Sequence, residues 1–208
     1  MNLRRALLPL TACAALVAAL ITPQSPLVAD NTPTSARASD AQLAAAFKRA
    51  TNDKGRFSAA DRQLLLSRPE VASQVVDVDS GTLDTGIELA AYATRSRTVD
   101  RFVRYYSLTG GAVIDYHFTV GWGYNGDKVV NTPTRGHYIV SYTEGMYDRG
   151  LNSTGVMNLP GPYAWTIDGQ GQWEQCIYKY GCFASGSPFT RFGVYLDGTY
   201  SYYARASN

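Results

Sequence analysis

Apolar residues in the segment 40–97 recur at the spacing of amphipathic helices. Leu43, Phe47 and Ala50 follow one another at intervals of three or four residues, which places them on one face of a helix. Asp40 is the expected N-cap of this helix. Three more helices are expected after it: one capped by Ser58, a short one that begins at Pro69, and one over residues 87–93.

Beyond residue 97 the apolar pattern changes to a period of two, as strands require. In residues 112–124 one set of alternate positions is apolar and largely aromatic, while the other set carries Asp115, His117 and Thr119. The apolar set consists of Ile114, Tyr116, Phe118, Val120, Trp122 and Tyr124. This alternation predicts an antiparallel strand that buries its aromatic face.

Turn signals separate this strand from further strands. Asn125–Gly126 is a two-residue hairpin signal, and Asp197–Gly198 lies between two more alternating runs. Short strands with frequent glycine and proline between them are typical of sandwiches and small barrels. The sequence therefore predicts an α+β fold, in which a short N-terminal helical segment (residues 40–97) precedes an antiparallel β-sandwich or small barrel (residues 98–208).

The N-terminus has the pattern of a secretory signal. Two arginines precede the apolar run 6–21, which is shorter than the roughly 20 residues that a membrane-spanning helix needs. Small residues favour cleavage after Ala29, with Ala38 as a second candidate position. A lipidated Cys13 is the alternative, and it is disfavoured because the apolar run continues past that residue.

The composition after the signal sets limits on the partners. Residues 1–29 are expected to be the signal peptide, and the polar residues 30–39 a flexible leader. Without the two arginines of the signal, the 19 Lys and Arg residues fall to 17, which equals the number of Asp and Glu residues. A neutral chain has no general attraction to nucleic acid or to anionic membranes. We therefore expect a secreted protein with no nucleic-acid partner and no stable membrane insertion after signal cleavage.

Two cysteines remain in the mature chain, Cys176 and Cys182. An even number of cysteines in an exported protein predicts a disulfide bond. A zinc site would need further cysteine or histidine ligands nearby, and a redox pair would have two intervening residues instead of five. We therefore expect a structural disulfide.

The residues around these cysteines also carry a resemblance. The run Trp173, Cys176, Tyr180-Gly181-Cys182 and Asp197-Gly198-Thr199, with Trp122-Gly123-Tyr124-Asn125-Gly126 upstream, resembles a group of uncharacterised secreted proteins of high-GC Gram-positive bacteria. The resemblance implies a secreted β-domain behind a helical preface. It implies no activity and no catalytic residue.

The chain has two histidines, His117 and His137, and each has a carboxylate nearby in sequence, Asp115 and Glu144 respectively. Such pairs can act as a general base or bind a metal. If the strands flanking the Asn125–Gly126 turn form a two-residue hairpin, Ile114 faces His137. The two histidines then lie on opposite faces of the sheet, which disfavours a joint site.

Motifs for other chemistry are weak. The chain has no Gly-x-Ser-x-Gly elbow, no His-Glu-x-x-His and no phosphate-binding glycine loop. A hydrolase with paired carboxylates stays open, because two acids need only be neighbours in space. Its candidate acids are Asp115, Glu144, Asp148, Asp168 and Glu174. Surface acids that serve only solubility are the alternative interpretation.

An acidic turn at residues 77–88 has part of the spacing of a calcium loop. Thr82 occupies the position that needs glycine, and Asp84 the position that is usually apolar. The turn is thus better explained as a helix cap. No cofactor, metal site or catalytic residue is assigned from the sequence.

Aromatic residues are the remaining signal, since most of the 15 tyrosines follow residue 104. Tyrosine rings suit recognition surfaces because they combine contact area with a polar tip. Filling of the sheet core with aromatics is the alternative explanation. The candidate binding aromatics are Tyr124, Tyr147, Tyr163, Tyr195, Tyr200 and Tyr202.

The expected function is non-catalytic binding of an extracellular partner, either a glycan of the cell envelope or environment, or another exported protein. The alternatives are the secreted hydrolase with paired carboxylates and a secreted inhibitor or toxin-like effector, whose Cys176–Cys182 loop presents the contact residues.

Overall fold

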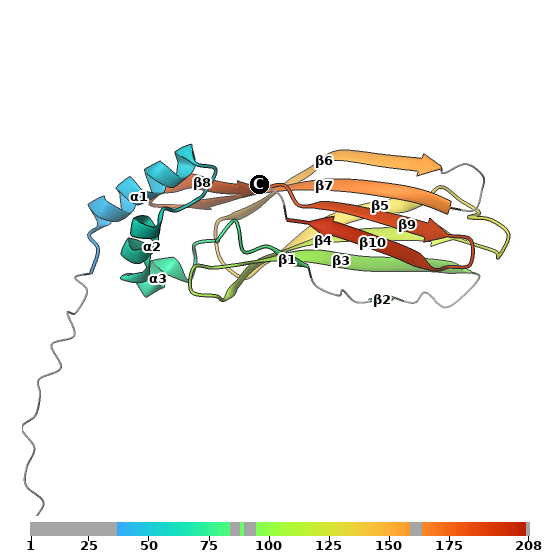
Figure 1. Ribbon diagram of the computed structural model, residues 1–208, viewed down its shortest axis with the longest axis horizontal. Helices are drawn as coiled ribbons and strands as arrows, with labels where there is room; N and C mark the ends of the chain where they lie inside the picture. Colours follow the sequence, from blue (N-terminus) through green and yellow to red (C-terminus); the bar gives the residue numbers. More distant parts are fainter. Residues whose placement is uncertain (1–36, 84–87, 90–94, 159–163, 207–208) are drawn as a thin grey trace, which may run out of the picture. The chain divides into compact units, whose positions relative to one another are not determined.

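The computed structural model describes residues 37–83, 88–89, 95–158 and 164–206, all of them within one compact unit. The expected signal peptide, its cleavage site after Ala29 and most of the leader lie outside the described residues. Helices come first along the chain and strands follow (Figure 1). The helices are α1 (Asp40–Asn52), α2 (Ala59–Leu66) and α3 (Pro69–Ala72). The strands are β1 (Thr82–Leu83), β2 (Glu88–Leu89), β3 (Ser96–Tyr106), β4 (Ala112–Gly123), β5 (Thr134–Ser141), β6 (Met146–Asn158), β7 (Ala164–Ile177), β8 (Gly181–Gly186), β9 (Phe189–Tyr195) and β10 (Tyr200–Arg205).

The strands form two antiparallel sheets that lie as two layers (Figure 1). The first sheet has the order β1-β3-β4-β5, and β2 also pairs with β3. The second has the order β10-β9-β7-β6, and β8 also pairs with β7. The expected α+β class with a β-sandwich is therefore confirmed.

The core lies between the sheets and is strongly aromatic. The predicted inner face of β4 is buried from Ile114 to Trp122 at every second residue. The second sheet contributes Trp173 and Phe192, and Trp173 packs edge-on against Tyr105 of β3 with 4.9 Å between the ring centres. Alternate residues thus meet across the layers, as in other sandwiches.

Helix ends follow the sequence closely. Ser58 caps α2 by accepting the N–H of Asp61, and Pro69 opens α3, both as predicted. The cap of α1 is Ser39, one residue before the expected Asp40. Its side chain accepts from the backbone of Gln42, whose own side chain accepts from the Ser39 N–H. This reciprocal capping box satisfies two backbone donors, whereas capping by Asp40 alone would satisfy one.

The predicted helix over residues 87–93 is wrong where the structure describes it. Glu88–Leu89 is strand β2, which pairs with Val99 and Thr98 of β3. A short apolar stretch beside an open strand edge gains ladder hydrogen bonds there, and tertiary pairing overrides its weak helical pattern. In the described residues the last helix ends at Ala72, so strands begin well before residue 98.

The hairpin between β4 and β5 has a longer loop than predicted. Asn125–Lys128 forms a four-residue loop closed by a bridge between Tyr124 and Val129. The longer loop shifts the pairing by two residues and the irregular segment 130–133 by two more, so that His137 pairs with Phe118 and not with Ile114. An even shift leaves every side chain on its predicted face, because the strand period is two. His137 therefore lies on the inner side of the sheet and His117 on the outer side.

The helices pack against β8 through aromatic rings. Phe47 of α1 stacks on Tyr180 with 4.3 Å between ring centres and meets Phe183 edge-on at 4.8 Å. Ala38, at the end of the expected flexible leader, is already buried, and its N–H donates to Ser67. In the described residues no helix has the length and apolar character needed to cross a membrane.

Replacing Phe47 with Ala tests whether helices and sheets unfold together. We expect the substitution to lower the free energy of unfolding by about 3–5 kcal/mol, because it removes a buried ring from that interface. Urea denaturation followed by circular dichroism and by tryptophan fluorescence should still give one coincident transition. The exposed Leu66 of α2 provides the control, with an expected change below about 0.5 kcal/mol for Leu66→Ala. A separate early transition of the helical signal would contradict a single cooperative unit.

Candidate functional site

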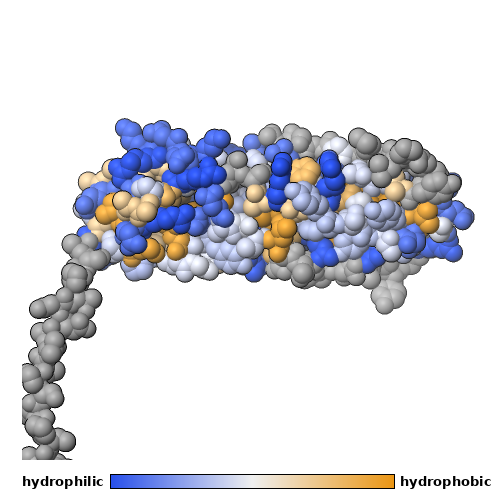
Figure 2. Space-filling view, in the orientation of Figure 1, coloured by the Kyte–Doolittle hydropathy of each residue, from blue (hydrophilic) through white to orange (hydrophobic). Residues whose placement is uncertain are grey.

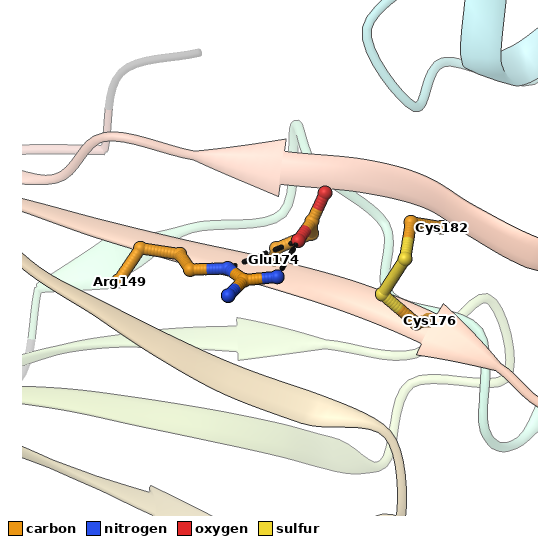
Figure 3. The surroundings of a disulfide bond; sticks show 4 residues. All are labelled: Arg149, Glu174, Cys176 and Cys182. Carbon is orange, nitrogen blue, oxygen red and sulfur yellow. Dashed lines mark hydrogen bonds and ion pairs between the residues drawn. A yellow bond between two sulfur atoms is a disulfide. The ribbon is translucent and has the colours of Figure 1, made fainter.

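The predicted disulfide bond is present between Cys176 and Cys182 (Figure 3). The two cysteines face each other as register partners on β7 and β8. The bond encloses residues 177–181, which comprise the last residue of β7, the turn and the first residue of β8. We call this segment the disulfide loop. In the chain-entropy model, closing a loop of this length stabilises the fold by roughly 2 kcal/mol.

Helix α1 holds the disulfide loop in place at two points. Tyr180 stacks on Phe47, and the Lys179 ammonium forms an ion pair with Asp40. The hydrogen bond from Lys179 is the main reason that the pKa of Asp40 lies below its ordinary value. Between these anchors and the disulfide, Tyr178 is fully exposed. The loop therefore presents one aromatic ring to solvent from a fixed base.

A groove runs beside the disulfide loop. A depression of about 510 Å³ is lined by Tyr147, Tyr178 and residues of the loop, and a second of about 420 Å³ is lined by Tyr142. Gln74 and Glu144 line both depressions, so the two lie side by side. We call this surface the tyrosine groove. Its three tyrosines are each about half exposed or more.

The walls of the groove are fixed by backbone contacts of β7. In the β5–β6 turn Gly145 has a φ of +77°, and a Cβ atom there would lie 2.0 Å from the carbonyl oxygen of Cys176. Its own carbonyl accepts the N–H of Cys176 at 2.8 Å. The buried amide of Gln175 donates to the carbonyl of Gln74 and accepts the N–H of Val76. Both sides of the groove are therefore attached to the same strand.

The charged groups around the groove are nearly all paired. Arg149 forms an ion pair with Glu174 (Figure 3) and lies 5.5 Å from the ring centre of Tyr147. Lys179 is held by Asp40. Glu144, by contrast, forms no ion pair with any residue that the structure describes. The groove therefore has one carboxylate whose charge is not neutralised.

A second polar cluster lies on the outer face of the first sheet, around Asp100. The carboxylate of Asp100 accepts the hydroxyl of Tyr138 at 2.5 Å, and both its oxygens lie 3.1 Å from Nδ1 of His117. The imidazole is stacked against Tyr138 at 4.2 Å, with Phe102 at 4.9 Å. Desolvation, together with the bond to Asp100, raises the pKa of Tyr138 to about 12.

The expected pairing of His117 with Asp115 is wrong. His117 contacts Asp100 across the strands and not its sequence neighbour Asp115. Asp100 lies at Nδ1 of the imidazole. The other ring nitrogen, Nε2, has no hydrogen-bond partner among the described side chains. An imidazole held at Nδ1 by a carboxylate with Nε2 open is oriented for proton transfer.

Asp115 belongs to a neighbouring network on the same face. Arg104 binds it through two hydrogen bonds of 2.7 Å, and the hydroxyl of Tyr142 donates to it at 2.8 Å. The hydrogen bond to Asp115 raises the pKa of Tyr142, and Asp115 likewise raises the pKa of Arg104. The hydroxyl of Tyr142 thus belongs to this network, while Tyr142 also lines the tyrosine groove.

His137 has its own carboxylate, which is Asp148 and not the expected Glu144. Its Nε2 atom lies 3.2 Å from Asp148, where the strands β5 and β6 of the two sheets come together. Tyr116, whose ring stacks near His137, donates its hydroxyl to the carbonyl of Gly150 at 2.9 Å. Burial raises the pKa of Tyr116. The two histidines thus take part in separate contacts on opposite faces.

Other candidate carboxylates are neutralised by arginine. Asp168 binds Arg191 through two bonds of 2.7 Å, and Glu174 binds Arg149. Together with the Arg104–Asp115 pair, three of the five candidate acids are engaged in this way. A carboxylate whose oxygens are engaged by a guanidinium has fewer lone pairs left to contact a substrate or water.

The acidic turn at residue 77 is likewise occupied. Asp77 binds Arg62 at 2.7 and 2.9 Å, which lowers the pKa of Asp77, and Asp79 pairs with Arg56 at 3.2 Å. The arginines take the place that a calcium ion would have as counter-charge. In the described residues, one group of three metal-ligand residue types lies close together, namely Glu174, Cys176 and Cys182. Its sulfur atoms are joined in the disulfide and do not offer thiolate ligands.

The predicted binding tyrosines fall into three groups. Tyr147 and Tyr195 are exposed, and Tyr147 lines the tyrosine groove. Tyr163 lies outside the described residues. Tyr124, Tyr200 and Tyr202 are half-buried against the core.

Tyr200 and Tyr202 are held inside the β3–β10 edge of the sandwich. The guanidinium of Arg101 lies 5.4 Å from the ring centre of Tyr200 and 5.7 Å from that of Tyr202. Burial is the main reason that the pKa of Tyr202 is raised. These two rings of β10 therefore contact Arg101 of β3 across the two sheets.

The sequence analysis missed four exposed tyrosines, at positions 138, 142, 178 and 203. Tyr178 could have been found, because the disulfide loop is too short to bury all of its side chains. In the view of Figure 2, hydrophobic residues form small patches between hydrophilic ones, and strongly hydrophilic residues gather over the helical end. Comparison of the chain with protein-family models, with curated proteins and with solved structures found no match.

Proposed function

We propose that this is an exported binding protein that holds an extracellular polysaccharide in the tyrosine groove without transforming it. The observation that carries the proposal is that three exposed tyrosines, Tyr142, Tyr147 and Tyr178, line two adjacent depressions of the surface. Their rings offer flat apolar faces on which sugar rings stack, and their hydroxyls offer hydrogen bonds to sugar hydroxyls.

The scaffold supports binding because it fixes these rings before a ligand arrives. The disulfide and the Tyr180–Phe47 stack hold the loop that carries Tyr178, and Gly145 fixes the turn between Tyr142 and Tyr147. A preformed site loses less conformational entropy on binding than a mobile one. Two depressions side by side suit a chain of several sugar units.

Export is part of the proposal. The signal-like N-terminus and the resemblance to secreted proteins support it, and the disulfide bond is compatible with an oxidising exterior. A second exported protein is the other partner considered from the sequence. The groove favours a polymer because its aromatic rings are spread over two depressions and do not gather in one apolar patch.

Replacing groove tyrosines with alanine should weaken binding. We expect Tyr147→Ala and Tyr178→Ala each to reduce affinity for a bound polysaccharide by about 1–2 kcal/mol, by analogy with stacking of bases on aromatic rings. Affinity is measured by pull-down on insoluble cell-wall and plant polysaccharides, with the thermal midpoint of each variant recorded beside it. Tyr142→Phe keeps the ring and loses only the bond to Asp115, so its binding should persist.

Tyr203 provides a matched control. It is exposed on β10 to a similar extent but does not line the groove, so Tyr203→Ala should bind like the unmodified protein. Equal losses for Tyr203→Ala and Tyr178→Ala, or no binding to any polysaccharide, would contradict the assignment of the groove.

One observation favours a second candidate function, a hydrolase. The Asp100–His117 pair has the arrangement of a general base, because the carboxylate lies at Nδ1 and Nε2 has no hydrogen-bond partner among the described side chains. In such a reaction His117 would take a proton from water, the resulting hydroxide would attack an ester carbonyl, and the proton would pass to the leaving alcohol. This pair replaces the paired carboxylates expected from the sequence.

The two histidines allow a direct test of this candidate. If His117 is a general base, His117→Gln should reduce hydrolysis of p-nitrophenyl acetate by about 100-fold, since general-base catalysis contributes about that much or more. His137→Gln should have no effect, because the Nε2 atom of His137 is already bound to Asp148. Equal rates in all three proteins would exclude this role for His117.

A further inference from the structure

Glu144 gives the tyrosine groove a charge preference. Its side chain lines both depressions of the groove, so it lies between Tyr142 on one side and Tyr147 and Tyr178 on the other. It is exposed and forms no ion pair with the residues that the structure describes. A bound ligand would therefore meet a negative charge midway along the groove.

The positive groups near the groove do not cancel this charge. Lys179 is engaged by Asp40, and Arg149 by Glu174. Arg104, which lies 5.8 Å from the ring centre of Tyr142, is engaged by Asp115. Each of these cations is engaged by a carboxylate, although Lys179 shares Asp40 with Arg68. Among the residues that line the two depressions, Glu144 is the acidic one, and its charge is not engaged by any of these cations.

Aromatic rings beside a carboxylate form a site that favours cations. The face of a tyrosine ring attracts an ammonium group through its quadrupole, and the carboxylate adds a charge-assisted hydrogen bond. Tyr147 already shows this property within the protein, since Arg149 lies over its ring. An anionic polymer would instead be repelled by Glu144.

We infer that the tyrosine groove selects polysaccharides that carry free amino groups, with Glu144 binding the ammonium while the tyrosines stack on the sugar rings. This inference rests on the proposed function and specifies its ligand class. It assigns Glu144 a role in selectivity that is separate from the stacking role of the tyrosines.

The test compares two oligosaccharides that differ only at the amino group. Isothermal titration is carried out with a β-1,4-glucosamine hexamer and with its N-acetylated counterpart, in mildly acidic buffer in which the amines are protonated. We expect the glucosamine hexamer to bind about threefold to tenfold more tightly. Glu144→Gln should remove this difference and leave the affinity for the acetylated hexamer unchanged.

Asp127 provides the control for net charge. It is an exposed carboxylate in the β4–β5 loop that does not line the groove, so Asp127→Asn should keep the full preference. Equal binding of both hexamers, or an undiminished preference in Glu144→Gln, would overturn the charge preference while the glycan-binding function stands. Failure of both hexamers and of all polysaccharides to bind would overturn the proposed function itself.

Discussion

Strand β7 is the element on which both the core and the groove depend. Its inward residues include Trp173 and Gln175, which are fully buried, and its outward residues include Glu174 and Cys176. Because side chains alternate along a strand, burial of the first pair fixes the direction of the second. The core therefore determines where the disulfide, the Arg149–Glu174 pair and one wall of the groove lie.

Gln175 has a particular part in this coupling. A buried amide is costly unless its donor and acceptor are satisfied, and both of them bond to the backbone around residue 75. The segment after α3 is thereby attached to β7. Gln74, which lines the groove, is held in the same place. A polar residue in the core thus connects the helical part of the chain to the tyrosine groove.

Ion pairing explains why one acid differs from the others. Arginines occupy most of the carboxylates that the sequence offered as catalytic or metal-binding groups, including Asp77, Asp115 and Asp168. The exposed Arg191–Asp168 pair contributes little stability, whereas the Arg104–Asp115 pair has a buried carboxylate. Glu144, which lines the groove, forms no such pair with the described residues.

The sequence predicted features that depend on local periodicity. The aromatic face of β4 and the caps of the short helices follow from residues that are close together in the chain. The same holds for the disulfide, whose two cysteines are six residues apart. The loop length after Tyr124 and the strand at Glu88–Leu89 depend on pairing with distant strands. The partners of His117 and Asp115 depend on the register of β3, which no short-range pattern encodes. The groove was not predicted, because it joins residues 74, 142–147 and 176–181 in space.

The central claim is that the tyrosine groove is the ligand-binding surface. The most direct measurement is a map of backbone amide shifts by nuclear magnetic resonance, recorded while a soluble oligosaccharide is added to isotopically labelled protein. The account predicts that the shifted amides cluster at residues 142–147 and in the disulfide loop, with β10 unaffected. Shifts that cluster around His117 on the outer face of the first sheet, with the groove unchanged, would contradict it.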